Sequence, residues 1–266
     1  MLKVAMVQVR NGSILMMFLL CVLQGVTSGS DSERRAGEQG MREVETFTSA
    51  GVSGRLDGWT SMEDKFDDVY GIGMEGNNYF LKARAKDKSA IIAKECNYSL
   101  KEFPILTWKW RAYQLPQGGD ERYKNSGDSV AGIYIIFPSP IAPGKLKNGF
   151  GIKIPIPDSL KPECLKYVWS SSLPKGTVIE SPFSSKTRVI VVESGAASLK
   201  QWIPEEVNVF QDYLKAFGKE PDAVHAIGIL TDADNTASEA IADYDDIFIK
   251  QDTTHSRSVS EDKRAQ

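Results

Sequence analysis

The sequence predicts a mainly β protein, an antiparallel β-sandwich of the jelly-roll or galactose-binding-like type with one packed α-helix. Short apolar or alternating runs, bounded by Gly, Pro, Asn and Asp, recur from about residue 79 to residue 250, and this pattern is typical of strands. Only one segment has a helical period, so helices do not alternate regularly with strands as a doubly wound fold requires. A mixed α/β sheet stays open as the alternative.

Eight segments have the strand pattern. In chain order, the predicted strands are Tyr79–Ala85, Ser89–Lys94, Ile105–Ala112, Val130–Phe137, Lys166–Trp169, Thr187–Glu193, His225–Leu230 and Tyr244–Lys250. The alternation is clearest in the third, where polar residues separate Leu106, Trp108 and Trp110. Because successive side chains of a strand point to opposite faces, these three residues share one face, which we expect to lie in the core.

One α-helix is predicted over Pro204–Phe217. Its apolar residues, spaced by three and four positions, are Ile203, Val207, Phe210, Leu214 and Phe217. This spacing places them on one side of a helix. Proline is tolerated in the first turn, and Gly218 followed by Pro221 is a stop signal. We expect the helix to lie against a sheet.

The first residues have the composition of a secretory signal peptide. Lys3 and Arg10 precede an apolar run at 14–23, and small residues follow it up to position 28. The run is short for a membrane span, and the small residues suit cleavage by signal peptidase. The sequence therefore predicts export to the periplasm or cell surface, with no transmembrane span after cleavage. An uncleaved anchor and a start site further along the chain are the alternatives.

The chain of 266 residues is long enough for one large β domain. Both ends of the mature chain are polar and charged, which predicts flexible segments there. The predicted division is a signal peptide at 1–28, a flexible polar segment at 29–45, a single β-sandwich domain at 46–250 and a disordered polar tail at 251–266.

Composition excludes several classes of function. The net charge of −3 leaves no overall basic surface for nucleic acid. His225 and His255 are too few for a multi-histidine zinc site. After signal cleavage, Cys96 and Cys164 remain, and both a disulfide and two free thiols are consistent with the sequence. The chain has no GxSxG elbow, P-loop or GxGxxG motif, so the common hydrolase, nucleotide and dinucleotide functions have no support.

An acidic turn is predicted between the last two strands. Asp232, Asp234 and Thr236 occupy alternate positions, and Asp243 stands where a twelve-residue calcium loop has its last ligand. Calcium prefers oxygen ligands, so this spacing is chemically suitable. An EF-hand is not supported, because Ala237 stands where that loop needs glycine. Two interpretations remain: a structural calcium site, and a turn whose side chains bond to their own backbone.

The loop Gly118–Asp128 carries several charged residues between two predicted strands, and loops held by rigid strands concentrate binding groups. Flat aromatic faces complement sugar rings. The candidate ligand-binding residues are therefore Asp120, Glu121, Arg122, Asp128 and Trp169, with Tyr123 and Tyr134 as further aromatic candidates. Asp120 and Asp128 would act as acid and base in glycoside cleavage only at the separations that this chemistry requires. A merely solvated loop is the other interpretation.

The order of several segments resembles a family of exported bacterial proteins known as domain of unknown function 3047 (DUF3047). The segments that carry the resemblance are Leu106–Arg122, Gly127–Phe137, Tyr167–Thr177, Val191–Gly195, the predicted helix, and the acidic turn with its DYDDI ending. The resemblance implies a single compact β-rich domain outside the cytoplasm. It implies no established activity.

Together these features predict a non-catalytic module that binds a glycan or another component of the cell envelope. The export signal and the all-β pattern support this function. The DYDDI segment also looks like the last strand of many carbohydrate-binding sandwiches, which is an analogy at the level of the fold. The alternatives are an enzyme that acts on glycans or esters through acidic loop residues, and a structural protein of the envelope.

Overall fold

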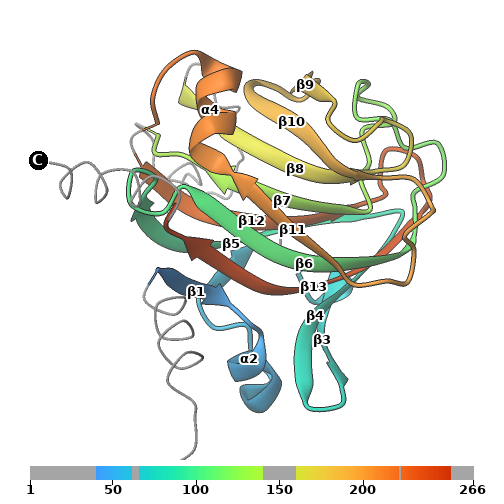
Figure 1. The fold of residues 1–266 in the computed structure, drawn as a ribbon. Coiled ribbons are helices and arrows are strands. Elements are labelled where there is room, and N and C mark those ends of the chain that lie inside the picture. Colours follow the sequence, from blue (N-terminus) through green and yellow to red (C-terminus); the bar gives the residue numbers. More distant parts are fainter. Residues whose placement is uncertain (1–39, 62–65, 140–159, 222, 253–266) are drawn as a thin grey trace, which may run out of the picture. The chain divides into compact units, whose positions relative to one another are not determined.

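The computed structural model describes residues 40–61, 66–139, 160–221 and 223–252. These residues form two β-sheets, sheet A and sheet B, and three short helices (Figure 1). The predicted signal peptide at 1–28 lies outside the described residues, as do most of the predicted flexible segment at 29–45 and most of the predicted tail at 251–266.

Each sheet consists mostly of antiparallel neighbours. Sheet A has the order β11 (Ile203–Asn208), β6 (Ile105–Gln114), β13 (Glu239–Lys250), β4 (Asn78–Lys86), β3 (Tyr70–Glu75), and β1 (Met41–Glu45) pairs with the end of β13. Sheet B has the order β2 (Trp59–Ser61), β5 (Ser89–Ser99), β12 (Ala223–Asp232), β7 (Ala131–Ile136), β8 (Cys164–Ser170), β10 (Ser184–Ser194), β9 (Val178–Ser181). Only the pair β8 and β10 is parallel among the described strands.

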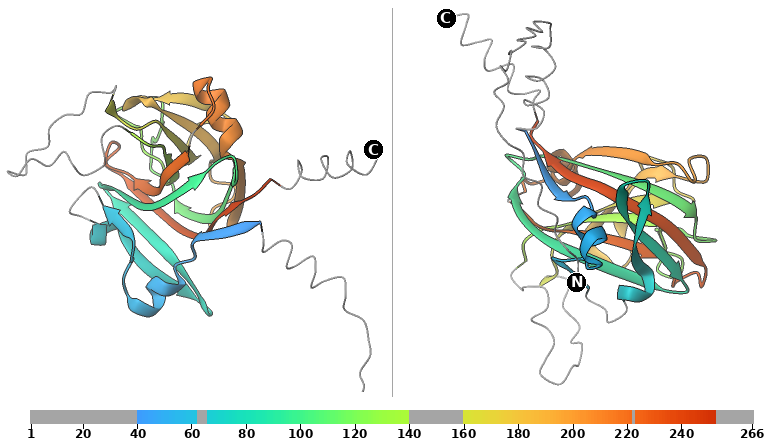
Figure 2. Two further views of the ribbon diagram at one scale, coloured as in Figure 1. Left: turned by 90° about the vertical axis from the view of Figure 1, so that its left-hand side faces the viewer. Right: turned by 90° about the horizontal axis from the view of Figure 1, so that it is seen from below.

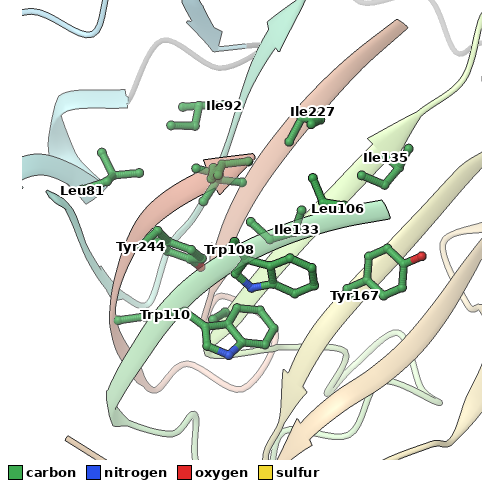
Figure 3. Close-up of a cluster of buried hydrophobic side chains, with 14 of the residues drawn as sticks. Leu81, Ile92, Leu106, Trp108, Trp110, Ile133, Ile135, Tyr167, Ile227 and Tyr244 are labelled. Carbon is green, nitrogen blue, oxygen red and sulfur yellow. The ribbon is translucent and has the colours of Figure 1, made fainter. Parts of the chain in front are cut away.

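The hydrophobic core lies between the two sheets. Leu106, Trp108 and Trp110 point inward from β6, with at most 2% of each exposed, as the alternation predicts. The ring of Trp108 lies 5.8 Å from that of Tyr167, and the ring of Trp110 lies 6.1 Å from that of Trp169, both on β8 of the opposite sheet. Figure 3 shows the two β6 tryptophans facing Tyr167 and Ile133. The predicted antiparallel β-sandwich is therefore confirmed.

All eight predicted strands are present, and five further strands were not predicted. The strands β2 and β9 are too short to show a period, and β3 is interrupted by Gly71 and Gly73. Gly73 is required by close packing, because a Cβ there would lie 2.4 Å from the ring of Phe80 on β4. The sequence signal of β3 is weak because the glycine that interrupts it allows β3 to pack closely on β4.

The strand β1 lies inside the range predicted to be flexible. Its residue Glu45 is buried and accepts hydrogen bonds from Trp59 Nε1 at 2.9 Å and from Lys94 Nζ at 2.8 Å. These partners hold the pKa of Glu45 below its usual value, although burial acts to raise it. The charged composition therefore predicted a flexible segment where an ordered strand lies. Glu45 is paired inside the protein and does not face solvent.

The predicted helix over 204–217 is correct only in its second half. Residues Ile203–Asn208 form the edge strand β11, and the helix α4 spans Val209–Phe217. Proline is tolerated at a sheet edge, which explains Pro204. The side chain of Asn208 caps the helix by accepting from Gln211 N at 3.0 Å, and Gly218 ends it at φ 69°. The prediction failed here because Ile203 and Val207, four positions apart, fit the helical period of about 3.6 residues as well as the strand period of two.

The helix α4 packs on sheet B, as expected, while α2 (Thr48–Ser53) and α3 (Phe66–Val69) are short connections (Figures 1 and 2). Tyr213 stacks on Phe137 at 4.3 Å, and Asp212 accepts from Tyr167 Oη at 3.0 Å. The two cysteines of the described chain, Cys96 and Cys164, are free thiols. Within the described residues, no helix is both long and apolar enough to cross a membrane.

Two buried tyrosines of sheet A reach across the core to the end of β12 in sheet B. Tyr244 Oη donates to Leu230 O at 2.9 Å, lies 2.7 Å from Thr231 Oγ1 and accepts from Gly132 N at 3.3 Å. Tyr70 Oη donates to Ala90 O at 2.7 Å and accepts from Thr231 N at 3.1 Å. We call this pair of hydroxyls and their partners the tyrosine clamp.

Replacement of Tyr244 by phenylalanine is expected to destabilise the protein. The substitution keeps the ring but removes a partner from buried groups of Gly132 and Thr231, and each unsatisfied buried group costs about 1–3 kcal/mol. Urea unfolding should show this loss, whereas Tyr123→Phe, which alters an exposed ring, should change the free energy of unfolding by less than about 0.5 kcal/mol. Equal free energies of unfolding for the two variants would contradict the proposed contribution of the tyrosine clamp to stability.

Glu205 on β11 faces a largely apolar region. It is 9% exposed, and Trp110 Nε1 donates to its Oε1 at 3.3 Å. Burial raises its pKa to about 7; the charge of Glu193 adds to this, whereas Lys175 and the Trp110 hydrogen bond partly offset it. The folded protein therefore holds this proton more tightly than the unfolded chain, in which the pKa is 4.5.

The raised pKa of Glu205 predicts a loss of stability with rising pH. Its contribution is complete below about pH 4.5 and disappears as the pH rises through about 7, with an amplitude of roughly 1–3 kcal/mol. Glu205→Gln should flatten the dependence of unfolding free energy on pH in this window. Glu206→Gln, on the exposed face of the same strand, should leave the slope unchanged. A slope that Glu205→Gln does not alter would refute this origin.

Candidate functional site

A pocket of about 250 Å³ lies on the outer face of sheet B, away from the core. Its apolar floor consists of Ile91 on β5, Leu230 on β12 and Val189 on β10. Polar groups from three connecting segments surround this floor. The remaining lining residues are Ser89, Glu121, Gly127, Tyr134, Lys166, Ser181, Pro182, Phe183, Asp232, Asp234 and Asn235.

Three carboxylates lie together at one side of this pocket. One oxygen each of Asp128, Asp232 and Asp234 lies within 4.8 Å of the other two. Asp128 precedes β7, and Asp232 is the last residue of β12. Because β7 and β12 are antiparallel neighbours, the start of one lies beside the end of the other. The sheet topology thus brings together two acids that are far apart in the sequence. We call these three residues the acidic cluster.

Asp128 fixes the turn between β12 and β13. It is fully buried, and its Oδ1 accepts from Asn235 N at 3.1 Å. Its Oδ2 accepts from Thr236 N at 2.8 Å and from Thr236 Oγ1 at 2.5 Å. Thr236, in the turn between β12 and β13, is therefore bonded to Asp128 in the loop that precedes β7. The two acidic loops converge because this carboxylate joins them.

Asp232 is a buried acid with unused hydrogen-bonding capacity. It is 8% exposed, and its Oδ1 has no hydrogen-bond partner among the described residues. Burial raises its pKa to about 8; the charges of Asp128 and Asp234 also raise it, whereas Lys166 acts to lower it. Asp232 is therefore protonated more readily than an ordinary aspartate.

Glu121 and Lys166 complete the polar lining. Glu121 is 1% exposed; its Oε2 accepts from Ser170 Oγ at 2.7 Å, whereas its Oε1 has no partner among the described residues. Lys166 Nζ donates to Ser129 Oγ at 3.2 Å. Burial acts to lower the pKa of Lys166, but Tyr134 and the nearby acids outweigh it, so the pKa is raised and the lysine stays charged.

Two aromatic rings border the pocket. Lys166 Nζ lies 5.7 Å from the ring centre of Tyr134, which is within range of a cation–π contact. Phe183, between β9 and β10, is 48% exposed. Its ring packs on Gly127, where a Cβ would lie 2.6 Å from a ring carbon. Glycine at 127 thus permits the loop before β7 and the β9–β10 turn to touch.

The structure brings some predicted site residues together and separates others. Glu121, Asp128, Asp232, Asp234 and Thr236 lie in or beside the pocket. Asp120 and Arg122 form an ion pair of 2.6 Å with each other at the loop surface, outside the lining. The guanidinium lowers the pKa of Asp120.

Two further predicted site residues, Trp169 and Asp243, lie away from the pocket. Trp169 is fully buried, and its Nε1 donates to Gly195 O at 3.0 Å, so it is a core residue. Asp243 belongs to the outer face of sheet A, where its Oδ2 accepts from Arg111 at 2.9 Å and from Tyr113 Oη at 2.9 Å. The calcium-loop spacing fails for Asp243 because the chain enters the strand β13 after the turn.

Sequence reasoning missed several lining residues, of which Lys166 and Phe183 are the most informative. A charge inside the apolar run CLKYVW, and a single phenylalanine inside the polar turn SPFSS, were the available signals. Chemically, the site combines an apolar floor, an exposed ring, hydrogen-bond acceptors without donors, and a group of oxygen ligands of the kind that hard cations prefer.

Replacement of Asp128 by asparagine is expected to loosen the turn at 233–238. An amide accepts through only one of its two terminal atoms, so either Asn235 N or the Thr236 donors lose their charged acceptor, at a cost of about 1.5–3 kcal/mol. Hydrogen exchange of the Asn235 and Thr236 amides should become faster. Asp120→Asn, on the loop surface, should leave these amides unaffected. Unchanged protection in the Asp128 variant would disprove this role.

Several solved structures share a general likeness with this protein. The family 11 carbohydrate-binding module of the cellulosomal cellulase Lic26A-Cel5E of Clostridium thermocellum has 8% identity and a TM-score of 0.39, with 80% of this chain and 95% of that chain covered. The xyloglucanase domain of NopAA from Sinorhizobium fredii, in complex with cellobiose, has 12% identity and a TM-score of 0.37, with 74% and 96% covered. At these TM-scores the likeness supports no conclusion about function.

The sequence comparisons identify the family. No match was found among curated proteins. The family model described as "Protein of unknown function (DUF3047)" matches residues 57–248, which is well over half of the chain, and confirms the resemblance to that family. The protein therefore belongs to the DUF3047 family.

Proposed function

We propose that the protein is a non-catalytic carbohydrate-binding protein, and that the pocket on the outer face of sheet B holds one sugar unit. The observation that carries this proposal is that the pocket has an apolar side and a polar side. An apolar floor and an exposed ring, Phe183, face buried acceptor oxygens of Glu121 and Asp232 that have no donor among the described residues. Location outside the cytoplasm, predicted from residues 1–28, is part of the proposal.

The apolar side of the pocket suits the C–H face of a sugar ring. Ile91, Val189 and Leu230 form a floor on which such a face would rest, and Phe183 offers a flat ring beside it. Burial of this surface favours binding by the hydrophobic effect, at roughly 25 cal/mol per Å² of apolar area removed from water.

The polar side of the pocket suits sugar hydroxyls. The free Oε1 of Glu121 needs a donor, and a buried acceptor without a donor costs about 1–3 kcal/mol. Hydroxyl groups supply donors and also accept, so Lys166 and Asn235 would find partners on the same ligand. An unpaired buried oxygen raises the free energy of the free protein, and a hydrogen bond from a sugar hydroxyl would remove that penalty in the complex.

The size of the pocket limits the ligand. Pockets for drug-sized ligands are about 300–1,000 Å³, and this one is about 250 Å³. It therefore suits one sugar unit, such as a chain end or a single ring within a longer glycan. A long stretch of polysaccharide would extend beyond it.

The spacing of the acids favours binding over glycoside cleavage. Glycosidases place their two carboxyl groups about 5–5.5 Å apart, or about 6.5–9.5 Å apart when a water attacks. Oxygens of the acidic cluster lie within 4.8 Å of each other. Moreover, both oxygens of Asp128 accept hydrogen bonds from the turn. The acidic cluster is therefore more compact than either type of catalytic pair, which supports binding rather than cleavage by these three acids.

Binding should be tested by calorimetric or NMR titration against a panel of mono- and oligosaccharides, followed by product analysis. We expect binding without turnover, and a loss of about 3–10-fold in affinity for Phe183→Ala, since one aromatic contact contributes about 0.5–1.5 kcal/mol. Tyr123→Ala removes another exposed ring outside the lining and should bind like wild type. Hydrolysis products, or equal affinity of both variants, would count against the proposal.

A further inference from the structure

We propose that Asp128, Asp232 and Asp234 bind one calcium ion at the side of the pocket. The inference concerns the protein's own acidic cluster and stands apart from the sugar proposal, because it requires no saccharide. It rests on two independent observations, which are the convergence of three carboxylates and the presence of an unpaired, buried oxygen among them.

The first observation is geometric. One oxygen each of Asp128, Asp232 and Asp234 lies within 4.8 Å of the others. Calcium–oxygen distances are about 2.3–2.6 Å, so ligands on opposite sides of the ion lie about 4.6–5.2 Å apart and neighbouring ligands lie closer. An ion between these three oxygens would therefore reach all of them with little rearrangement.

The second observation is the unpaired oxygen of Asp232. The side chain is more than nine-tenths buried, lines the pocket, and its Oδ1 has no hydrogen-bond partner among the described residues. Buried polar atoms are almost always satisfied, and an exception indicates a missing partner. A cation beside Asp128 and Asp234 supplies that partner.

The remaining oxygens of the cluster are held in position and keep free capacity. Asp234 Oδ2 accepts from Ser89 Oγ at 2.7 Å, and Asp128 Oδ1 accepts from Asn235 N at 3.1 Å. A carboxylate oxygen has two acceptor sites, so each of these acids retains a lone pair for a cation. Asp234 is exposed, which leaves space for water ligands to complete the six to eight that calcium takes.

The charge around the cluster also calls for a cation. Glu121, Asp232 and Asp234 all line the pocket, and Lys166 is the one basic side chain among the lining residues. Lys166 Nζ is bonded to Ser129 Oγ, so it balances this charge only in part. A divalent ion would neutralise most of the remainder.

The ligand types favour calcium over other metals. The set contains only oxygen donors, whereas zinc prefers nitrogen and sulfur. Magnesium demands near-ideal octahedral geometry and gives up its water reluctantly. An exposed aspartate beside two fixed ones forms a site of irregular geometry, which calcium tolerates.

The proposal is tested on the full chain after treatment with EDTA and without any saccharide. Thermal unfolding and calorimetric titration are followed with CaCl2, with MgCl2, and with NaCl at matched ionic strength. At about 100 times the dissociation constant, calcium should raise the melting temperature by about 5–10 °C. Asp234→Asn alters an exposed ligand and should fold, yet lose at least about tenfold in calcium affinity.

Glu239→Gln is the matched control. It removes the same charge from an exposed residue just after the same turn and should bind calcium like wild type. Asp232→Asn should also lose calcium binding, and it should not gain stability from added calcium. The proposal is overturned if calcium produces neither heat nor a thermal shift, if Asp234→Asn and Glu239→Gln bind equally, or if NaCl reproduces the shift. None of these results depends on whether the protein binds sugars.

Discussion

The tyrosine clamp is the contact on which the arrangement of the site depends. A β-sandwich is held together mainly by non-directional apolar packing, which fixes the distance between sheets better than it fixes the position of a strand end. Tyr70 and Tyr244 add directional hydrogen bonds from sheet A to Leu230 and Thr231. The next residue along β12 is Asp232. Two hydroxyls buried in the core therefore determine where a carboxyl group stands on the outer face.

The same strand end shows how a buried polar network and a ligand pocket can share one backbone segment. Side chains alternate along β12, so Thr231 points toward the clamp and Asp232 toward the pocket. Asp128 then joins the start of β7 to the following turn. Thr231 is paired within the clamp, whereas among the described residues Asp232 Oδ1 on the pocket side has no hydrogen-bond partner.

The sequence predicted the parts of this fold that depend on local pattern. Strict alternation in β6 identified Trp108 and Trp110 as core residues, and the polar run before β13 identified the turn. The prediction failed where contacts between distant segments determine the secondary structure. At β11, pairing with β6 produces a strand although the apolar spacing is helical. The acidic cluster was predicted only in part, because the contact of Asp128 with the turn depends on strand order, which one sequence does not reveal.

Lys166 supplies the positive charge among the buried acids of the pocket. Removing charges from water costs several kcal/mol, and an apolar side chain of similar volume is often at least as stabilising. The raised pKa of Lys166 indicates that Tyr134 and the nearby acids offset this cost for the lysine. Its stem passes Gly132, where a Cβ would lie 3.4 Å from Lys166 Cε, so the backbone leaves space for the side chain. Val168 and Val189 beside it show that apolar residues fit this surface. A charged lysine on a surface where an apolar side chain also fits, beside acceptors that lack donors among the described residues, agrees with the binding role proposed for the pocket.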